Sequence, residues 1–129
     1  MIRALKVVLI VFGVIEILLG LSMIIFPDQT ASQFGLSEAS GYITYLMVEL
    51  ATCIIAFSVF IIIAARDPVR HINWVKFAIV VCILGALGGL YAVIRGAVDF
   101  SHVSMQIIMD AVFAVIFLAL YPYKAAKGG

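Results

Sequence analysis

Long apolar stretches separated by short polar segments make up most of this chain. Four stretches are about twenty residues long, the length an α-helix needs to cross a bilayer. They are Ala4–Phe26, Tyr42–Ala64, Ile72–Ile94 and Val103–Tyr121. Unbroken runs such as CIIAFSVFIIIAA favour helices, because a helix satisfies its own backbone groups in lipid. The pattern predicts an all-α integral membrane protein, with one four-helix domain over residues 1–129.

Residues that break helices stand between or after these stretches: Pro27, Pro68, Gly96 and Pro122. Since the connections are short, we expect neighbouring helices to run antiparallel. The longest connection, PDQTASQFGLSEASG, is amphipathic enough to lie on the membrane surface around Phe34–Leu36.

Basic residues predict how the helices are oriented. Only Arg95 falls on one side of the predicted membrane, whereas the other side carries Arg3, Lys6, Arg66, Arg70, Lys76, Lys124 and Lys127. Cytoplasmic loops carry the excess of lysine and arginine. We therefore expect both termini, and the loop between the second and third spans, in the cytoplasm. A multi-pass protein of a bacterial inner membrane is the expected setting.

Composition agrees with a membrane location. Hydrophobic residues make up 66% of the chain and charged residues 12%, against about 45–50% and about 25% in soluble domains. The formal net charge of +1 gives no basic surface for nucleic acid. Cys53 and Cys82 lie inside apolar runs, where they serve as small apolar fillers rather than a disulfide framework. The first apolar run is too long for a signal peptide core of roughly 7–15 residues, so we expect a retained helix.

Three acidic residues, Glu16, Glu49 and Asp110, interrupt three of the predicted spans. At about 1.5 Å per residue, each falls about 10–15 Å below the outer end of its helix, so all three share one layer. Facing lipid, they would cost about 8–10 kcal/mol together, at roughly 2.5–3.5 kcal/mol each. We therefore expect them to point into the bundle, and at least one to be neutral at pH 7.

Helical spacing groups other residues with these acids. One expected inward face in each span carries Gly13, Glu16, Gly20 and Met23; Tyr42, Tyr45, Glu49 and Thr52; Tyr91, Arg95 and Asp99; His102, Gln106 and Asp110. These faces predict a polar pocket that opens outward, with Arg95 as the counter-charge and Tyr45, Tyr91 and Gln106 beside the acids.

Three interpretations of this layer are open. The polar residues could hydrogen-bond between helices and fix their packing; they could bind a proton, a cation or a small ligand; or they could contact a partner subunit. A metal site is not predicted, because His102 and Asp110 are about 12 Å apart along a helix and no Glu-x-x-His pair occurs. No cofactor is predicted either.

Two further segments attract attention. Small residues at helical spacing line the third span at Ala78, Cys82, Gly85, Gly89, Ala92 and Gly96, which indicates close packing within the bundle or a self-association face. In the loop AARDPVRH, we expect Asp67 to cap the next helix with Pro68 at its first position. Arg66 and Arg70 can contact lipid headgroups, and with His71 they could instead dock a partner.

The segments AARDPVRH and DAVFAVIFLALYP resemble the BphX-like small four-span bacterial membrane proteins. The resemblance covers Ala64–Pro122 and is carried by Arg66, Asp67, Pro68, His71 and Asp110. It implies a bacterial inner membrane protein found beside genes of aromatic-compound degradation, and no substrate. By analogy, Glu16 is also similar to the glutamate in the first span of small multidrug resistance transporters, although Trp74 does not match their third-span signature.

Three functions are therefore considered. The first choice is a non-enzymatic accessory or scaffold subunit that associates with itself or with other membrane subunits. The second is a proton- or cation-coupled transporter of small molecules that uses the carboxylate layer. The third is a lipid- or quinone-binding membrane subunit. No catalytic arrangement of residues argues for an enzyme.

Overall fold

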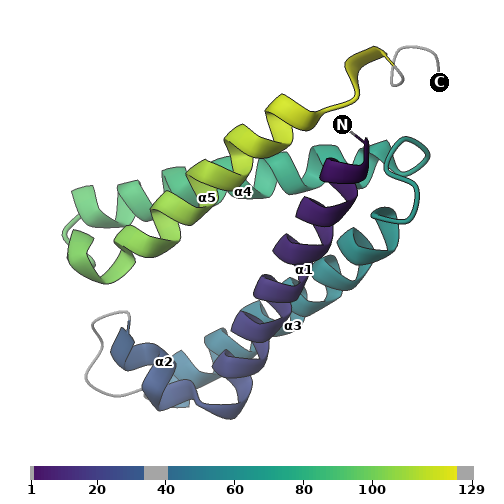
Figure 1. The fold of residues 1–129 in the computed structure, drawn as a ribbon. Helices are drawn as coiled ribbons and strands as arrows, with labels where there is room; N and C mark the ends of the chain where they lie inside the picture. Colours follow the sequence, from purple (N-terminus) through teal and green to yellow (C-terminus); the bar gives the residue numbers. More distant parts are fainter. Residues whose placement is uncertain (1, 34–40, 125–129) are drawn as a thin grey trace.

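The computed structural model describes residues 2–33 and 41–124, and the elements in these ranges are all helices. They are α1 (Ile2–Ile25), α2 (Pro27–Gln33), α3 (Gly41–Ala64), α4 (Ile72–Ile94) and α5 (Phe100–Leu120), as Figure 1 shows. Helices α1, α3, α4 and α5 are each long and apolar enough to cross a membrane. The predicted all-helical fold is confirmed, with four helices that could span a membrane where four spans were predicted. The first and fourth spans begin earlier than predicted, because the polar residues that precede the apolar runs are also helical.

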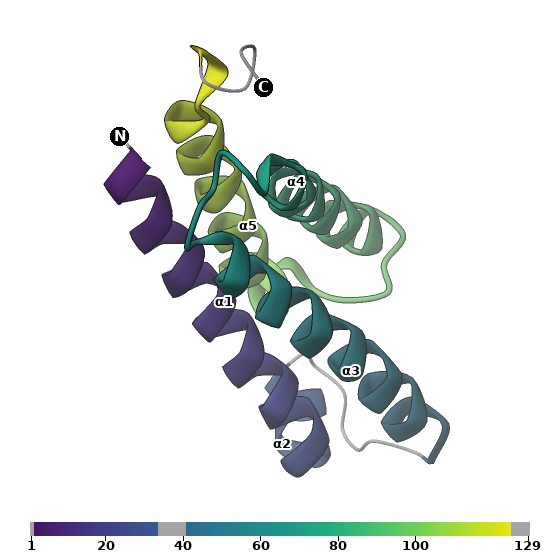
Figure 2. The ribbon, with the colours of Figure 1, turned by 90° about the vertical axis from the view of Figure 1, so that its right-hand side faces the viewer.

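The four long helices form two pairs. Helix α1 packs along α3, and α4 packs along α5, with smaller contacts of α1 with α5 and of α3 with α4. The pairs meet near the connection between α3 and α4 and diverge toward the end that carries α2, so the ribbon resembles an open V (Figure 1). The start of α1 and the end of α5 lie at the closed end of the V. Figure 2 shows the same arrangement from the side.

A hydrophobic cluster holds the two pairs together near the closed end. Phe12 of α1 is 2% exposed, and its ring lies 5.1 Å from that of Phe113 and 5.5 Å from that of Phe117 in edge-on contacts. Between α3 and α4, the ring of Phe60 stacks on that of Trp74 at 5.0 Å. Such aromatic pairs add to the packing energy, so this end is where the angle between the pairs is set.

Two glycines allow α1 to approach α3 closely. A Cβ added at Gly13 would stand 2.5 Å from Cγ1 of Ile62, and one added at Gly20 would stand 2.7 Å from Cγ1 of Ile55 and 3.2 Å from the carbonyl oxygen of Ala51. Lipid supplies no hydrophobic drive between helices, so close backbone approach through small residues is what favours their association. The α1–α3 pair depends on it.

The connection after α1 begins with a helix that the sequence pattern did not reveal. Pro27 takes the first position of α2, where its missing N–H costs nothing. The Thr30 hydroxyl donates to the Phe26 carbonyl oxygen at 2.8 Å and to that of Ser22 at 3.2 Å, which ties α2 back to α1. The surface segment predicted at Phe34–Leu36 lies outside the described residues.

The predicted cap at the start of α4 is wrong. Helix α4 begins at Ile72, and His71 occupies its N-cap position without a side-chain hydrogen bond. Asp67 instead accepts the Arg70 backbone N–H at 3.3 Å, and Pro68 is fully buried. Residues 67–71 form turns before the helix starts, so the Asp67 carboxylate closes a turn. Arg66 and Arg70 are exposed.

A Schellman motif ends α4. Gly96 adopts φ 74°, its N–H donates to the Val93 carbonyl oxygen at 3.0 Å, and the Ala97 N–H donates to that of Ala92 at 3.0 Å. Glycine takes a positive φ at no steric cost, so the predicted break at Gly96 is confirmed.

Candidate functional site

Glu16 and Asp110 lie side by side where the two helix pairs touch. Glu16 comes from the middle of α1 and is 9% exposed, and Asp110 comes from the middle of α5 and is 4% exposed. The two carboxylates are close enough to interact electrostatically. The expected inward face of α1 is confirmed, since Gly13, Glu16, Gly20 and Met23 are all buried.

Helix α4 makes room for this pair with small residues. A Cβ added at Gly85 would collide with the Asp110 carboxylate, so only glycine leaves space for the acid at this point. Cys82, one turn earlier, is fully buried and interacts electrostatically with both acids. The site is therefore built from three helices, α1, α4 and α5.

Gln106 holds the Asp110 side chain in place. Its Nε2 donates a hydrogen bond of 3.3 Å to Oδ2 of Asp110. The two residues are four apart on α5, the spacing that brings side chains together on one helix face. The predicted association of Gln106 with Asp110 is confirmed.

Glu16 differs from Asp110 in its partners. In residues 2–33 and 41–124, Glu16 forms no hydrogen bond, and the Asp110 carboxylate and the Cys82 thiol lie near it. In these ranges, every fully enclosed side-chain polar atom has a hydrogen-bond partner. Since Glu16 has none, its carboxylate oxygens must keep some accessible surface. A proton, a cation or a ligand donor can therefore reach it.

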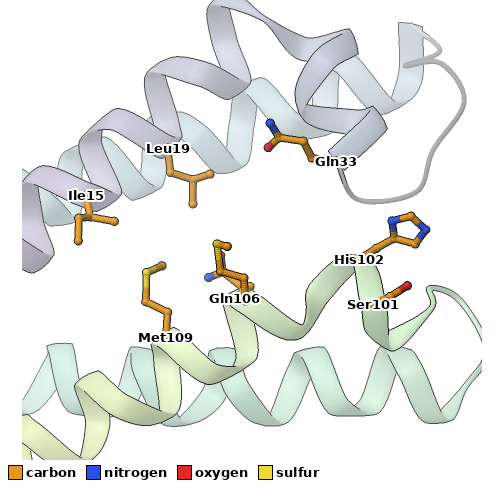
Figure 3. A pocket seen from close by; sticks show the side chains of 8 residues that line it. Ile15, Leu19, Gln33, Ser101, His102, Gln106 and Met109 are labelled. Carbon is orange, nitrogen blue, oxygen red and sulfur yellow. The ribbon is translucent and has the colours of Figure 1, made fainter.

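A cavity of about 520 Å³ lies between α1, α2 and α5, beside these acids. It is lined by Ile15, Leu19, Gln33, Ser101, His102, Met105, Gln106 and Met109 (Figure 3). Ile15 adjoins Glu16 in the sequence, and Met109 adjoins Asp110. The apolar part of the cavity therefore reaches the level of the acid pair.

Glu49 does not join the other two acids. It is exposed, as are Tyr42 (74%), Tyr45 (62%) and Thr52 on the same face of α3. The face that α3 buries carries Ala51 and Ser58. Glu49 and Ala51 are about 200° apart around a helix, so turning the small residues toward α1 turns Glu49 away. The prediction that all three acids converge is wrong for Glu49.

Arg95 and Tyr91 are also outside the site. Both are exposed, and Arg95 is the residue that ends α4. Asp110 stands ten residues into α5, about 15 Å along its axis from the α4–α5 connection. The predicted counter-charge is therefore not placed beside the acids. Of the polar residues expected with them, Gln106 lies at the site, and His102 lies at the cavity.

The small-residue stripe of α4 packs against α5. Ala78 and Cys82 are fully buried, and a Cβ added at Gly89 would stand 2.7 Å from Cγ1 of Ile107. The interpretation as packing within the bundle agrees with this contact. Self-association through the same face would require α5 to leave it.

The sequence argument missed most residues that line the cavity. Met105 and Met109 follow His102 at spacings of three and seven, which places them on one face of α5. That stripe was a usable signal. Gln33 was not predictable, because its position depends on α2. Across the described ranges, no three His, Cys, Asp or Glu side chains are grouped as a metal ion would require.

Comparison with protein-family models, with curated proteins and with solved structures finds no match to this chain.

Proposed function

We propose that this multi-pass membrane protein binds a proton or a small cation at the Glu16–Asp110 pair and couples that binding to the movement of a small molecule. The observation that carries the proposal is the burial of two carboxylates, from different helix pairs, against each other and beside a cavity. Proton- and cation-coupled transport was the second choice from the sequence, and the geometry of the acids now favours it.

The electrostatics of the pair explain why a proton or cation is needed. Two ionised carboxylates close enough to interact repel each other, by up to about 4 kcal/mol at contact with an effective dielectric constant near 20. Burial adds the cost of removing each charge from water. The Gln106 amide and the Cys82 thiol lie beside the two acids, and neither group carries a positive charge that would compensate them.

The same repulsion gives a route to coupling. Glu16 belongs to the α1–α3 pair and Asp110 to the α4–α5 pair. Ionising both acids pushes the two pairs apart, and a proton or cation between them draws the pairs together. Since the cavity lies between α1 and α5, this movement changes its width. A small molecule would then bind the two arrangements of the helix pairs with different affinity, which coupling requires.

The proposed orientation follows from the basic residues. Neighbouring spans run antiparallel, and the closed end of the V, with the start of α1, the end of α5 and the exposed Arg66 and Arg70, faces the cytoplasm. The open end and the cavity then face the outer side of a bacterial inner membrane. Asp28 and Arg95 are exposed at that end.

Solid-supported membrane electrophysiology on proteoliposomes tests the proposal without a known substrate. Rapid jumps of pH, Na⁺ and K⁺ should give transient currents from charge binding in the wild-type protein. Glu16→Gln should abolish the current that belongs to the coupling ion. Glu49→Gln removes the same charge from an exposed position and should leave that current unchanged. Currents that are absent from the wild type, or equal in Glu16→Gln, would refute proton or cation binding at this pair.

A second candidate function is an accessory subunit of a homo- or hetero-oligomeric assembly, the first choice from the sequence. The observation that favours it is Glu49, which is exposed on a membrane-spanning helix. A carboxylate facing lipid costs roughly 2.5–3.5 kcal/mol, and a neighbouring subunit would remove that cost. Native mass spectrometry from lipid nanodiscs should then show complexes that Glu49→Leu disrupts. Monomers alone would exclude self-association.

A further inference from the structure

The cavity between α1, α2 and α5 has a polar end and an apolar end. Figure 3 shows Gln33, Ser101 and His102 at one end and Ile15 and Met109 at the other. The polar end lies at the open side of the V, where α5 begins. A bound molecule would therefore place its polar head near the membrane surface and its apolar body toward the acid pair.

None of the lining residues carries a fixed charge. The polar groups are two carboxamides, a hydroxyl and an imidazole, and each of these groups can form hydrogen bonds with a neutral ligand. Gln33, Ser101 and His102 are exposed, so a headgroup at this end would lie near water and would gain hydrogen bonds from the lining rather than an ion pair. The lining therefore matches a neutral head that donates and accepts hydrogen bonds, and it supplies no fixed counter-charge for a phosphate, a carboxylate or an ammonium group.

The walls favour a flat ring. Met105 and Met109 stand about one helical turn apart on α5 and line the cavity together with Ile15 and Leu19 of α1. Figure 3 shows Met109 opposite Ile15 and Leu19. Methionine sulfur makes favourable contacts with aromatic rings, such as that of a quinol, and its flexible side chain fills irregular space. The volume of about 520 Å³ lies within the roughly 300–1,000 Å³ of small-molecule sites. It accommodates a substituted ring with part of an alkyl tail.

We infer that this cavity binds a neutral quinone or quinol of the membrane, with its ring oxygens at Gln33, Ser101 and His102 and its ring between Met105, Met109 and Leu19. The amides, the hydroxyl and the imidazole can donate to a quinone carbonyl or accept from a quinol hydroxyl. This binding goes beyond the proposed ion coupling and does not require it, because neither acid lines the cavity.

Photolabelling of the full-length protein in nanodiscs tests the inference. The probe is a benzoquinone with an azido group on the ring and a ten-carbon tail, and labelled peptides are located by mass spectrometry. We expect label on residues 15–19 and 101–109, and at least tenfold competition by unlabelled decyl-benzoquinone. Labelling spread evenly over the lipid-exposed faces of α3 and α4 would overturn the inference.

Two variants and one competitor sharpen the test. Leu19→Trp should fill the cavity and reduce labelling at least tenfold, while Leu18→Trp, at a 59% exposed position, should not change it. His102→Leu, at an exposed position that tolerates substitution, removes one hydrogen bond of about 1 kcal/mol and should reduce labelling roughly fivefold. Unchanged labelling in both Leu19→Trp and His102→Leu would refute the site. Equal competition by decanoate or decylamine would refute the selection of a neutral head.

Failure here is distinguishable from failure of the proposed function. Glu16→Gln should lose ion currents, and, since glutamine resembles the protonated acid, its quinone labelling should stay within twofold of the wild type when both are labelled at a pH low enough to protonate the pair. Loss of labelling in Glu16→Gln with a folded protein would place the probe at the acids and would overturn the assignment of its head to the open end.

Discussion

Gly85 of α4 faces the Asp110 carboxylate so directly that a methyl group there would collide with it. We therefore predict that Gly85→Ala destabilises the protein and disturbs the acid pair. Asp110 has a short side chain, its other flank is held by Gln106, and it is 4% exposed. Gly85 itself is exposed, so the collision falls on the Asp110 carboxylate, and either α4 and α5 separate or the hydrogen bond to Gln106 breaks.

The magnitude follows from a matched pair of variants. Overpacking of a filled interior costs about 1–3 kcal/mol, and replacing glycine by alanine inside a helix gains about 1 kcal/mol. Gly88→Ala provides the helix term alone, because a Cβ added there meets nothing within 4 Å. The difference in unfolding free energy between Gly85→Ala and Gly88→Ala should therefore be about 1–3 kcal/mol, with Gly85→Ala the less stable.

Equilibrium unfolding in mixed micelles of mild detergent and SDS, followed by circular dichroism, measures this difference. Gly85→Ala should also weaken the ion current that depends on Glu16, since Asp110 is displaced from its position beside Glu16. Equal stability of the two variants would mean that α4 does not approach Asp110 as closely as the structure places it. The account of the site as a junction of three helices would then be wrong.

Two further substitutions have defined outcomes. Phe12→Ala should lower the free energy of unfolding by roughly 2–4 kcal/mol. The loss is below the about 3–5 kcal/mol of soluble cores, because lipid is as apolar as the protein interior and burial in it gains less. The same micelle assay should show a loss of less than about 1 kcal/mol for Phe100→Ala, at a 50% exposed position, and equal losses in the two variants would contradict the assignment of Phe12 to the core. Gly96→Ala should cost about 1–2 kcal/mol, because φ at this residue is 74° and the left-handed region is unfavourable for a residue with a Cβ. A gain in stability there would mean that the α4–α5 connection adopts another conformation.

The spans were predictable from the sequence because of what lipid requires. Within hydrocarbon, a chain segment must satisfy its own backbone groups, and a run of about twenty apolar residues has only the helix to do so. The four runs therefore predicted four helices with ends correct to within a few residues. The short helix α2 was not predictable, since seven residues rich in polar side chains carry no hydropathy signal.

The rotation of each span was harder to predict. A helix between lipid and protein is apolar on all sides, so hydrophobicity does not show which face turns inward. In α1 the small residues Gly13 and Gly20 share a face with Glu16, and both signals give the correct answer. In α3 the polar residues and the small residues lie on opposite faces, and the small residues determine the packing. Where stripes of polar residues and of small residues lie on different faces of a span, the small residues therefore predict the buried face better.

The contrast between Glu16 and Glu49 has a consequence for assembly. Glu49 stands eight residues into α3, about 12 Å along the helix from its start at Gly41, and a bilayer core is about 30 Å thick. A glutamate side chain spans only a few of those 12 Å, so it cannot extend to the headgroup region as lysine or arginine does. With α3 upright in the membrane, Glu49 would remain at hydrocarbon depth. The packing of α3 against α1 through Ala51 and Ser58 fixes this exposure, so only a proton, a local inflow of water or a neighbouring subunit can relieve it. Tyr42 and Tyr45 lie on the same exposed face, and under the proposed assembly they would join that contact, since tyrosine is enriched at protein interfaces.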